Sequence, residues 1–109
     1  MSDFEIHKER DQLVISLEGP RVDISSVSEL RKELLAYIEA AELDETLPGI
    51  LVVDLGELVA LDSTGVALMV NLQKKVVESG RRFQLRNVNE TIHKMLQLSN
   101  LAEFFRITS

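Results

Sequence analysis

The segment ILVVDLGELVALDSTGVALM, residues 50–69, carries the strongest structural signal in the chain. Its first six residues form a short, nearly continuous apolar run, which is typical of a strand covered on both faces. Residues 62–65, DSTG, can open a helix, because Asp, Ser and Thr oxygens accept hydrogen bonds from the free amides of a first helical turn. The segment therefore predicts a buried strand, a loop, and a helix from about Ser63 to Ser79.

Apolar residues of that helix recur at three- and four-residue steps, which predicts one buried face. Gly80 stands where a C-terminal cap belongs, and two lysines in the last turns complement the helix dipole. The residues expected to share the buried face are Val66, Met69, Val70, Val76 and Val77.

The residues before this segment predict a hairpin and a helix. Alternating apolar residues within 4–17, interrupted by a charged turn, indicate two strands, and the Gly-Pro pair at 19–20 ends the second. Ser26 with Glu29 forms a capping box for a helix that follows. Residues 42–49, ELDETLPG, are interpreted as a loop inside one domain.

The residues after Gly80 predict a strand and a short helix. Residues 83–85 have the composition of a strand, and Asn89 can cap a third helix that carries Ile92, Met95 and Leu96. Residues 101–107 are apolar and short, so both a final helical turn and an edge strand remain open.

Strands that alternate with helices imply crossover connections and a sheet with parallel neighbours. The order strand, strand, helix, strand, helix, strand, helix predicts an α/β fold. We expect a mixed sheet with a parallel core of four to five strands, together with three to four helices. The 109 residues suffice for one compact domain, so residues 1–109 are assigned to a single domain.

Charge and composition exclude several classes of function. The net charge is −6 and the basic residues are dispersed, so a nucleic-acid partner is not expected. No apolar run approaches a membrane span and the first ten residues lack a secretory signal, which predicts a cytoplasmic protein without direct membrane insertion. Cysteine is absent, which excludes disulfides and thiolate chemistry.

No cofactor and no metal are expected. The sequence lacks glycine-rich phosphate-binding loops, and it has no His pair at helical spacing. Asp54 and Asp62 are interpreted as a strand-end acid and a helix cap. A hydrolase that uses Ser63 as nucleophile would need a base, and neither His7 nor His93 has a spacing that links it to that serine. An enzyme is therefore not expected, although the hydrolase is kept as a third hypothesis.

Residues 62–65 have two interpretations. The plain one is a helix cap and nothing more. In the other, the Ser63 hydroxyl at the helix start accepts a phosphoryl group, which brings about −1.5 to −2 charges to an acidic surface. A partner docked on this loop would then meet a repulsive, desolvated group. Thr64 could compete with Ser63 as the acceptor.

The segment 50–69 resembles the central strand, loop and helix of STAS domains, especially bacterial anti-sigma factor antagonists. Those proteins carry Asp-Ser-(Ser/Thr)-Gly at this turn, and their phosphoacceptor is the serine after the aspartate, which corresponds to Ser63. The likeness continues through QLVISLEG and through residues 79–105, and Asp23 lies near an acid that the family carries before its first helix. The chain departs from the family in the loop GPRVD, residues 19–23.

The resemblance implies a phosphorylation-switched protein-binding module. Its partner would be an anti-sigma factor that is also a serine kinase, and a serine phosphatase would reverse the modification. Ser63 would be the phosphoacceptor, and Asp23, Asp62, Thr64 and Gly65 would form the partner-binding switch loop. The chain would act as a monomer or a homodimer. The alternative is a STAS scaffold subunit of a stress-signalling or membrane-transport complex, in which an exposed apolar strip is used for assembly.

Overall fold

A computed structural model describes residues 4–19, 21–22, 27–42 and 48–108. In chain order the elements are β1 (Phe4–Glu9), β2 (Gln12–Leu17), β3 (Arg21–Val22), α1 (Val27–Glu42), β4 (Ile50–Asp54), β5 (Ala60–Leu61), α2 (Ser63–Glu78), β6 (Arg82–Arg86), α3 (Glu90–Leu98) and β7 (Arg106–Thr108).

Five strands form the main sheet in the order β1-β2-β4-β6-β7. The strand β1 is antiparallel to β2, and the other three pairs are parallel. The short strands β3 and β5 make a separate parallel pair. The predicted α/β class is therefore confirmed: among the described residues there are three helices and a mixed sheet with a parallel core.

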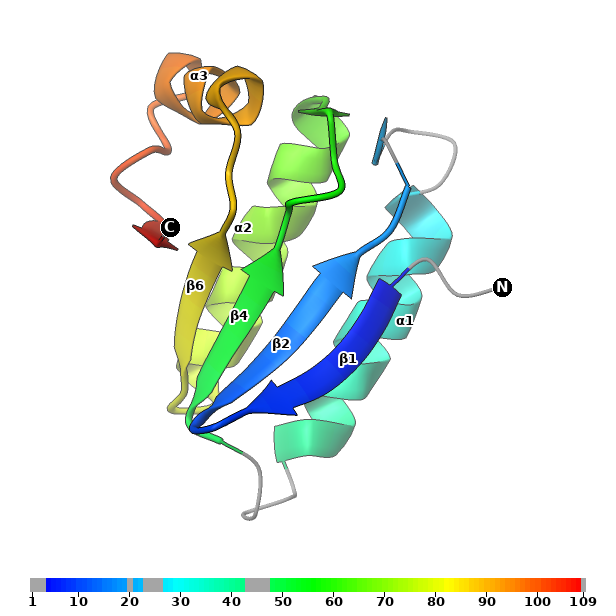
Figure 1. The fold of residues 1–109 in the computed structure, drawn as a ribbon. Coiled ribbons are helices and arrows are strands. Elements are labelled where there is room, and N and C mark those ends of the chain that lie inside the picture. Colours follow the sequence, from blue (N-terminus) through cyan, green and yellow to red (C-terminus); the bar gives the residue numbers. More distant parts are fainter. Residues whose placement is uncertain (1–3, 20, 23–26, 43–47, 109) are drawn as a thin grey trace.

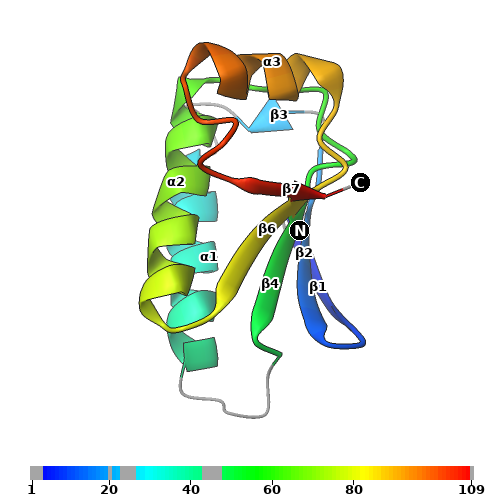
Figure 2. The same ribbon diagram turned by 90° about the vertical axis from the view of Figure 1, so that its left-hand side faces the viewer.

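The helices cover one face of the sheet and one of its ends. Figure 2 shows α1 and α2 side by side on the same face, while none of the described helices lies on the opposite face. The short helix α3 lies at the end of the sheet where the parallel strands finish (Figure 1). The buried side chains between sheet and helices form the core, and its largest fully buried members include Ile15, Leu17, Leu34, Leu51, Met69, Leu72 and Leu85.

The helix α2 begins where the sequence predicts, but its buried face is rotated relative to the prediction. Val66, Met69 and Val76 are buried as expected, whereas Val77 is 56% exposed and Val70 is only half-buried. Residues at 65, 68 and 72 complete the buried stripe instead. The prediction for Val77 was wrong because one residue step turns a side chain by about 100° around the helix.

The C-terminal end of α2 has the predicted glycine in a left-handed conformation, with φ +84° at Gly80. The amide of Gly80 donates to the Val77 carbonyl at 3.0 Å, and the Arg81 amide donates to the Val76 carbonyl at 3.1 Å. These two bonds define a Schellman motif, which satisfies carbonyls that the helix leaves free. The proposed capping serine of α1, Ser26, lies outside the described residues.

The open alternative for residues 101–107 is resolved as a turn followed by an edge strand. The strand β7 pairs with β6 in parallel through three residue pairs, with Gln84 opposite Arg106. Phe105 is buried just before it and contacts the Phe83 ring at a centroid distance of 6.3 Å. This aromatic anchor explains why the chain returns to the sheet after α3.

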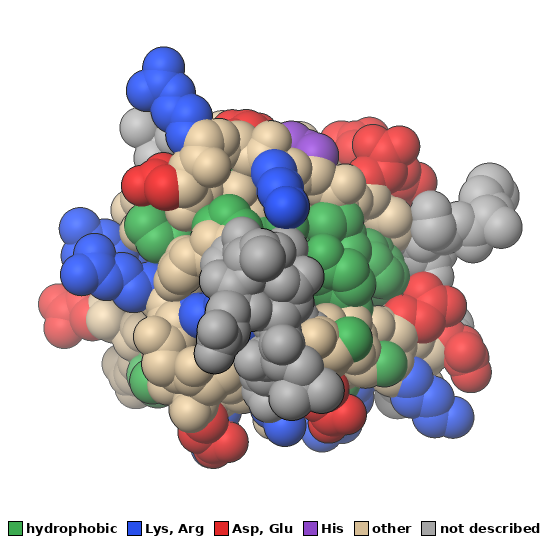
Figure 3. All heavy atoms as spheres, turned by 90° about the horizontal axis from the view of Figure 1, so that it is seen from below, with side chains coloured by type: hydrophobic (Ala, Val, Ile, Leu, Met, Phe, Trp, Pro, Cys, Tyr) green, Lys and Arg blue, Asp and Glu red, His purple; other side chains and the backbone are tan. Residues whose placement is uncertain are grey.

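Figure 3 shows the end of the molecule opposite α3. Acidic and basic side chains are interspersed around its rim, and hydrophobic side chains lie nearer the centre. Neither sign of charge dominates the part of this end that the structure describes.

Candidate functional site

Asp62 caps the helix α2, and its carboxylate organises the whole DSTG turn. One oxygen, Oδ1, accepts hydrogen bonds from the amides of Thr64 and Gly65, both at 3.0 Å. The same oxygen accepts the Thr64 hydroxyl at 2.5 Å. The Asp62 carbonyl accepts the Val66 amide at 3.0 Å, which closes the first helical turn. The predicted cap is thus confirmed and is assigned to Asp62 itself.

The turn leaves Ser63 and Thr64 in different environments. Ser63 is the first residue of α2 and is exposed. Among the described residues, no hydrogen bond involves the Ser63 side chain or amide. Thr64 is half-buried and its hydroxyl is already a donor to Asp62, while Gly65 is buried. Asp23, the remaining residue of the predicted switch loop, lies outside the described residues.

The loop that leads from β4 to the turn is held by a side chain at the end of β4 and by side chains of the loop after β6. Asp54 Oδ1 accepts the Gly56 amide at 2.8 Å and the Asn87 side-chain amide at 3.2 Å. The side-chain amide of Asn89 donates to the carbonyls of Leu58 at 3.0 Å and Val59 at 3.2 Å. Asn89 also caps α3 as predicted, because its Oδ1 accepts the Ile92 amide at 2.8 Å. The backbone just before Ser63 is therefore fixed from two sides.

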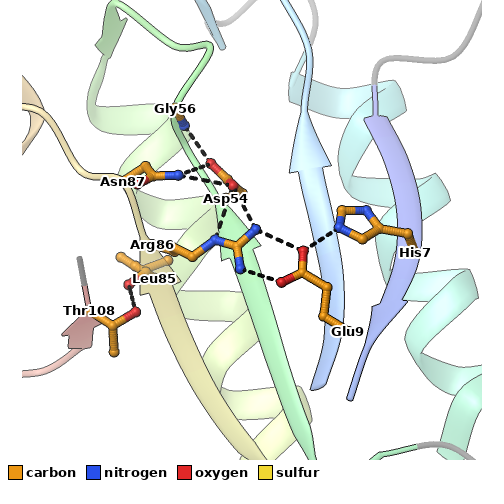
Figure 4. Close-up of polar contacts among 8 residues, drawn as sticks. All are labelled: His7, Glu9, Asp54, Gly56, Leu85, Arg86, Asn87 and Thr108. Carbon is orange, nitrogen blue, oxygen red and sulfur yellow. Dashed lines mark hydrogen bonds and ion pairs between the residues drawn. The ribbon is translucent and has the colours of Figure 1, made fainter. Parts of the chain in front are cut away.

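On the sheet face opposite α1 and α2, Arg86 connects Asp54, at the start of this loop, with Glu9 on β1 (Figure 4). Its guanidinium forms two hydrogen bonds with the Glu9 carboxylate, at 3.0 and 3.2 Å. It also donates to Asp54 Oδ2, at 3.0 Å from Nη2 and 3.1 Å from Nε. Glu9 in turn lies 2.5 Å from His7 Nε2. Sequence reasoning missed this network, since only the strand register brings its members together.

The network shifts the pKa values of both carboxylates. The hydrogen bonds from Arg86, followed by the bond from His7, lower the pKa of Glu9 to about 2. Burial raises the pKa of Asp54, but hydrogen bonds from Gly56, Asn87 and Arg86 outweigh it and leave that pKa below its ordinary value. Both groups therefore remain ionised at neutral pH. Asp54, at the end of β4, accepts hydrogen bonds from Gly56, Arg86 and Asn87, whereas Asp62 accepts them from the first turn of α2.

Two grooves flank the start of α2. The first, called the Ser63 groove below, is lined by Ser63, Val66, Ala67, Val70, Asn71, Ser99 and Leu101. The second lies between α1 and α2 and is lined by Val27, Ser28, Arg31, Thr64, Ala67 and Leu68. No histidine is among the described residues that line either groove.

Comparison with known proteins gives the family. A family profile described as "Mlab, STAS domain" matches residues 4–108. The chain therefore belongs to the STAS domain family, as the resemblance of its central segment indicates.

Solved structures support the fold at low sequence identity. The anti-sigma factor antagonist SpoIIAA in its unphosphorylated form is 22% identical, with a TM-score of 0.73, covering 97% of this chain and 88% of that one. An anti-sigma factor antagonist from Mycobacterium paratuberculosis is 18% identical, with a TM-score of 0.78, covering 95% and 82%. A sulfate transporter family protein from Wolinella succinogenes is 15% identical, with a TM-score of 0.67, covering 86% and 73%.

No helix in the described part of the chain combines the length and the apolar character that crossing a bilayer requires.

Proposed function

We propose that this chain is an anti-sigma factor antagonist that works as a phosphorylation-switched protein-binding module, with Ser63 as the phosphoacceptor. The observation that carries the proposal is the contrast within the DSTG turn. Ser63 is exposed and its hydroxyl has no hydrogen bond among the described residues, whereas the Thr64 hydroxyl is a donor to Asp62 at 2.5 Å. A kinase can reach the serine without opening the helix cap.

The geometry favours an effect on binding over an effect on folding. Asp62 already occupies the amides of Thr64 and Gly65, which are the donors that a helix start otherwise offers to a phosphate. A phosphoryl group on Ser63 would stand beside the Asp62 carboxylate and project into solvent. A partner that covers Ser63 would have to desolvate about two negative charges next to a third, which weakens binding strongly.

The proposed partner is an anti-sigma factor that is also a serine kinase. Binding of the unmodified chain would sequester it and free a sigma factor, phosphorylation of Ser63 would end the complex, and a serine phosphatase would restore it in the cytoplasm. Support comes from SpoIIAA, an anti-sigma factor antagonist whose structure is known in both unphosphorylated and phosphorylated forms. The phosphorylated form is 22% identical to this chain, with a TM-score of 0.67, and covers 97% of this chain and 91% of its own.

The test is the dissociation constant for the cognate kinase, measured for Ser63→Asp and for Ser63→Asn. The two side chains have nearly the same size, so they separate charge from steric effects. We expect Ser63→Asp to bind at least about 30-fold more weakly than wild type, and Ser63→Asn to bind within about threefold. Equal binding by Ser63→Asp and wild type would refute the charge mechanism.

A second candidate is a constitutive subunit of a stress-signalling or membrane-transport assembly. It is favoured by the structural likeness to a sulfate transporter family protein and by exposed apolar side chains at Val77, Leu98 and Phe104. Size-exclusion chromatography with light scattering separates the two candidates. A stable higher oligomer would favour the assembly subunit, and a monomer that forms a one-to-one complex with the kinase would favour the switch.

A further inference from the structure

On the sheet face opposite α1 and α2, Gln84 is a buried polar side chain without a partner. It lies in the middle of β6 and is 8% exposed. Its side-chain amide makes no hydrogen bond to the described part of the chain. Within that part, Gln73 Oε1 is the only fully buried side-chain polar atom without a partner, so the Gln84 amide reaches the surface. Polar groups this deeply buried normally have a partner, and this amide is free to bind one from outside.

Strand alternation and register show which side chains share this face with Gln84. The residues on either side of Gln84 pack into the core, so Arg82, like Gln84, points to the opposite face. Register places Arg106 of β7 directly beside Gln84, and the residue after Arg106 packs against the core. With strands about 4.8 Å apart and about 6.6 Å between alternate residues, the Cα atoms of Arg82 and Arg106 are roughly 8 Å apart. Both guanidinium groups can therefore reach one small group above Gln84.

The guanidinium groups of Arg82 and Arg106 are free. Both side chains are exposed, and neither makes a hydrogen bond or an ion pair to the described part of the chain. Arg86 lies on the same face but differs from them, because two carboxylates engage its guanidinium. The two free guanidinium groups and the Gln84 amide all offer N–H donors, and a set of such donors suits an oxyanion.

The surroundings of these donors favour a carboxylate over a phosphate. Glu9 and Asp54 already place two carboxylates on this face, both paired with Arg86. A phosphate dianion would add two charges near them, whereas a carboxylate adds one and matches the planar guanidinium fork. Because both free arginines are exposed, a small free acid would be poorly enclosed, so a larger body must present the carboxylate.

We propose that Arg82, Gln84 and Arg106 bind a carboxylate on an acidic segment of a partner protein. The Gln84 amide donates to one carboxylate oxygen, and the two guanidinium groups complete the contact. The net charge of −6 does not prevent this, since charges are screened beyond about 8 Å at physiological ionic strength and the local donors decide. The site lies on the face opposite α2, the helix that Ser63 begins, and it does not rest on the proposed function.

The experiment is an NMR titration of the full chain, labelled with ¹⁵N, at about 0.15 M salt. The probe is hexaglutamate capped at both ends, and capped hexaglutamine is the matched neutral peptide. The side-chain amide signal of Gln84 and the Nε–H signals of Arg82 and Arg106 report on the site. We expect hexaglutamate to shift these signals saturably, and hexaglutamine to leave them in place. No shift at these signals with hexaglutamate would overturn the proposal.

Three variants separate a built site from general attraction between charges. Arg106→Gln should weaken hexaglutamate binding at least about tenfold, and Gln84→Leu should weaken it about threefold without a change in charge. Lys94→Gln removes the same charge as Arg106→Gln from an exposed position on α3, and should change the dissociation constant by less than about twofold. Equal weakening by Lys94→Gln and Arg106→Gln, or unchanged binding by Gln84→Leu, would overturn the proposal.

Other ligands provide the remaining arms of the titration. Tighter binding of inorganic phosphate than of hexaglutamate would assign the site to phosphates, and saturation by acetate at the same concentrations would assign it to small acids. Shifts of the same signals on concentrating the chain alone would assign it to a second copy. Each of these results would overturn the proposal. Thermal unfolding checks that the variants are folded, and Gln84→Met, which has nearly the same length, replaces Gln84→Leu if that variant unfolds.

Discussion

The guanidinium of Arg86 on β6 forms a two-pronged ion pair with the carboxylate of Glu9 on β1, although β2 and β4 lie between them in the sheet. The pair therefore crosses over two strands on the face opposite α1 and α2 (Figure 4). Register places Val14 and Val52 side by side on the strands in between. Both valines are buried, with exposures of 0% and 1%.

Removing the Arg86 guanidinium, which pairs with both Glu9 and Asp54, should destabilise the domain. We expect Arg86→Met to lower the free energy of unfolding by about 1–3 kcal/mol, because Asp54 loses a charged hydrogen-bond donor. Urea denaturation followed by circular dichroism measures the change. Arg82→Met is the control, since Arg82 is exposed on the same strand and its loss should matter by less than about 0.5 kcal/mol. Equal effects of the two changes would contradict the bridging role.

The depressed pKa of Glu9 makes the Arg86–Glu9 ion pair sensitive to acid. The value falls from 4.5 to about 2 in the folded state, chiefly because Arg86 donates hydrogen bonds to the carboxylate. A carboxylate with a depressed folded-state pKa contributes stability above its unfolded pKa, and this contribution is lost as the pH falls through the folded pKa. Stability should thus decline between about pH 4.5 and pH 2. Arg86→Met should show a smaller decline over that window in acid titrations of unfolding, and parallel curves would argue against this origin.

The role of Asp62 as a helix cap can be tested separately from its negative charge. Asp62→Ala removes the acceptor for the amides of Thr64 and Gly65 and should cost about 1 kcal/mol of stability. Asp62→Asn keeps an oxygen acceptor at the same place and should lose much less. Thermal unfolding of the three proteins provides the comparison. An Asn variant as unstable as the Ala variant would mean that charge, and not capping geometry, holds the turn.

Asn89 has two roles that one substitution separates. Its Oδ1 caps α3, and its side-chain amide holds the carbonyls of Leu58 and Val59 in the loop before the DSTG turn. Asn89→Asp keeps the cap and removes the amide donor. We expect hydrogen exchange of amides in residues 55–61 to accelerate by about tenfold, while α3 keeps its protection. Acceleration spread over both segments would show that Asn89 only supports α3.

Local signals were sufficient to predict much of this fold and part of the site. A run of apolar residues predicts β4, the Asp62 and Asn89 caps predict the starts of α2 and α3, and Gly80 predicts the end of α2. Each of these features depends on neighbours within about four positions along the chain, so sequence alone contains the necessary information.

Features that depend on distant pairing were not predicted. Glu9 and Arg86 are 77 positions apart, and only the register of four strands brings them together. The β3–β5 pair is two residues long, which is too short for a periodic pattern. The predicted burial of Val77 was wrong, because a pattern of three- and four-residue steps fits more than one adjacent face of a helix. The Ser63 groove likewise forms only where the segment after α3 meets α2.

In the proposed switch, charge on Ser63 drives a partner away without unfolding the domain. The most direct measurement is calorimetric titration of the cognate kinase with the chain carrying phosphoserine at position 63, alongside the unmodified chain. We expect the phosphoserine form to bind about 100-fold more weakly or worse, with thermal stability nearly unchanged. Equal dissociation constants for the two forms, or a modified chain that binds weakly only because it has unfolded, would contradict it.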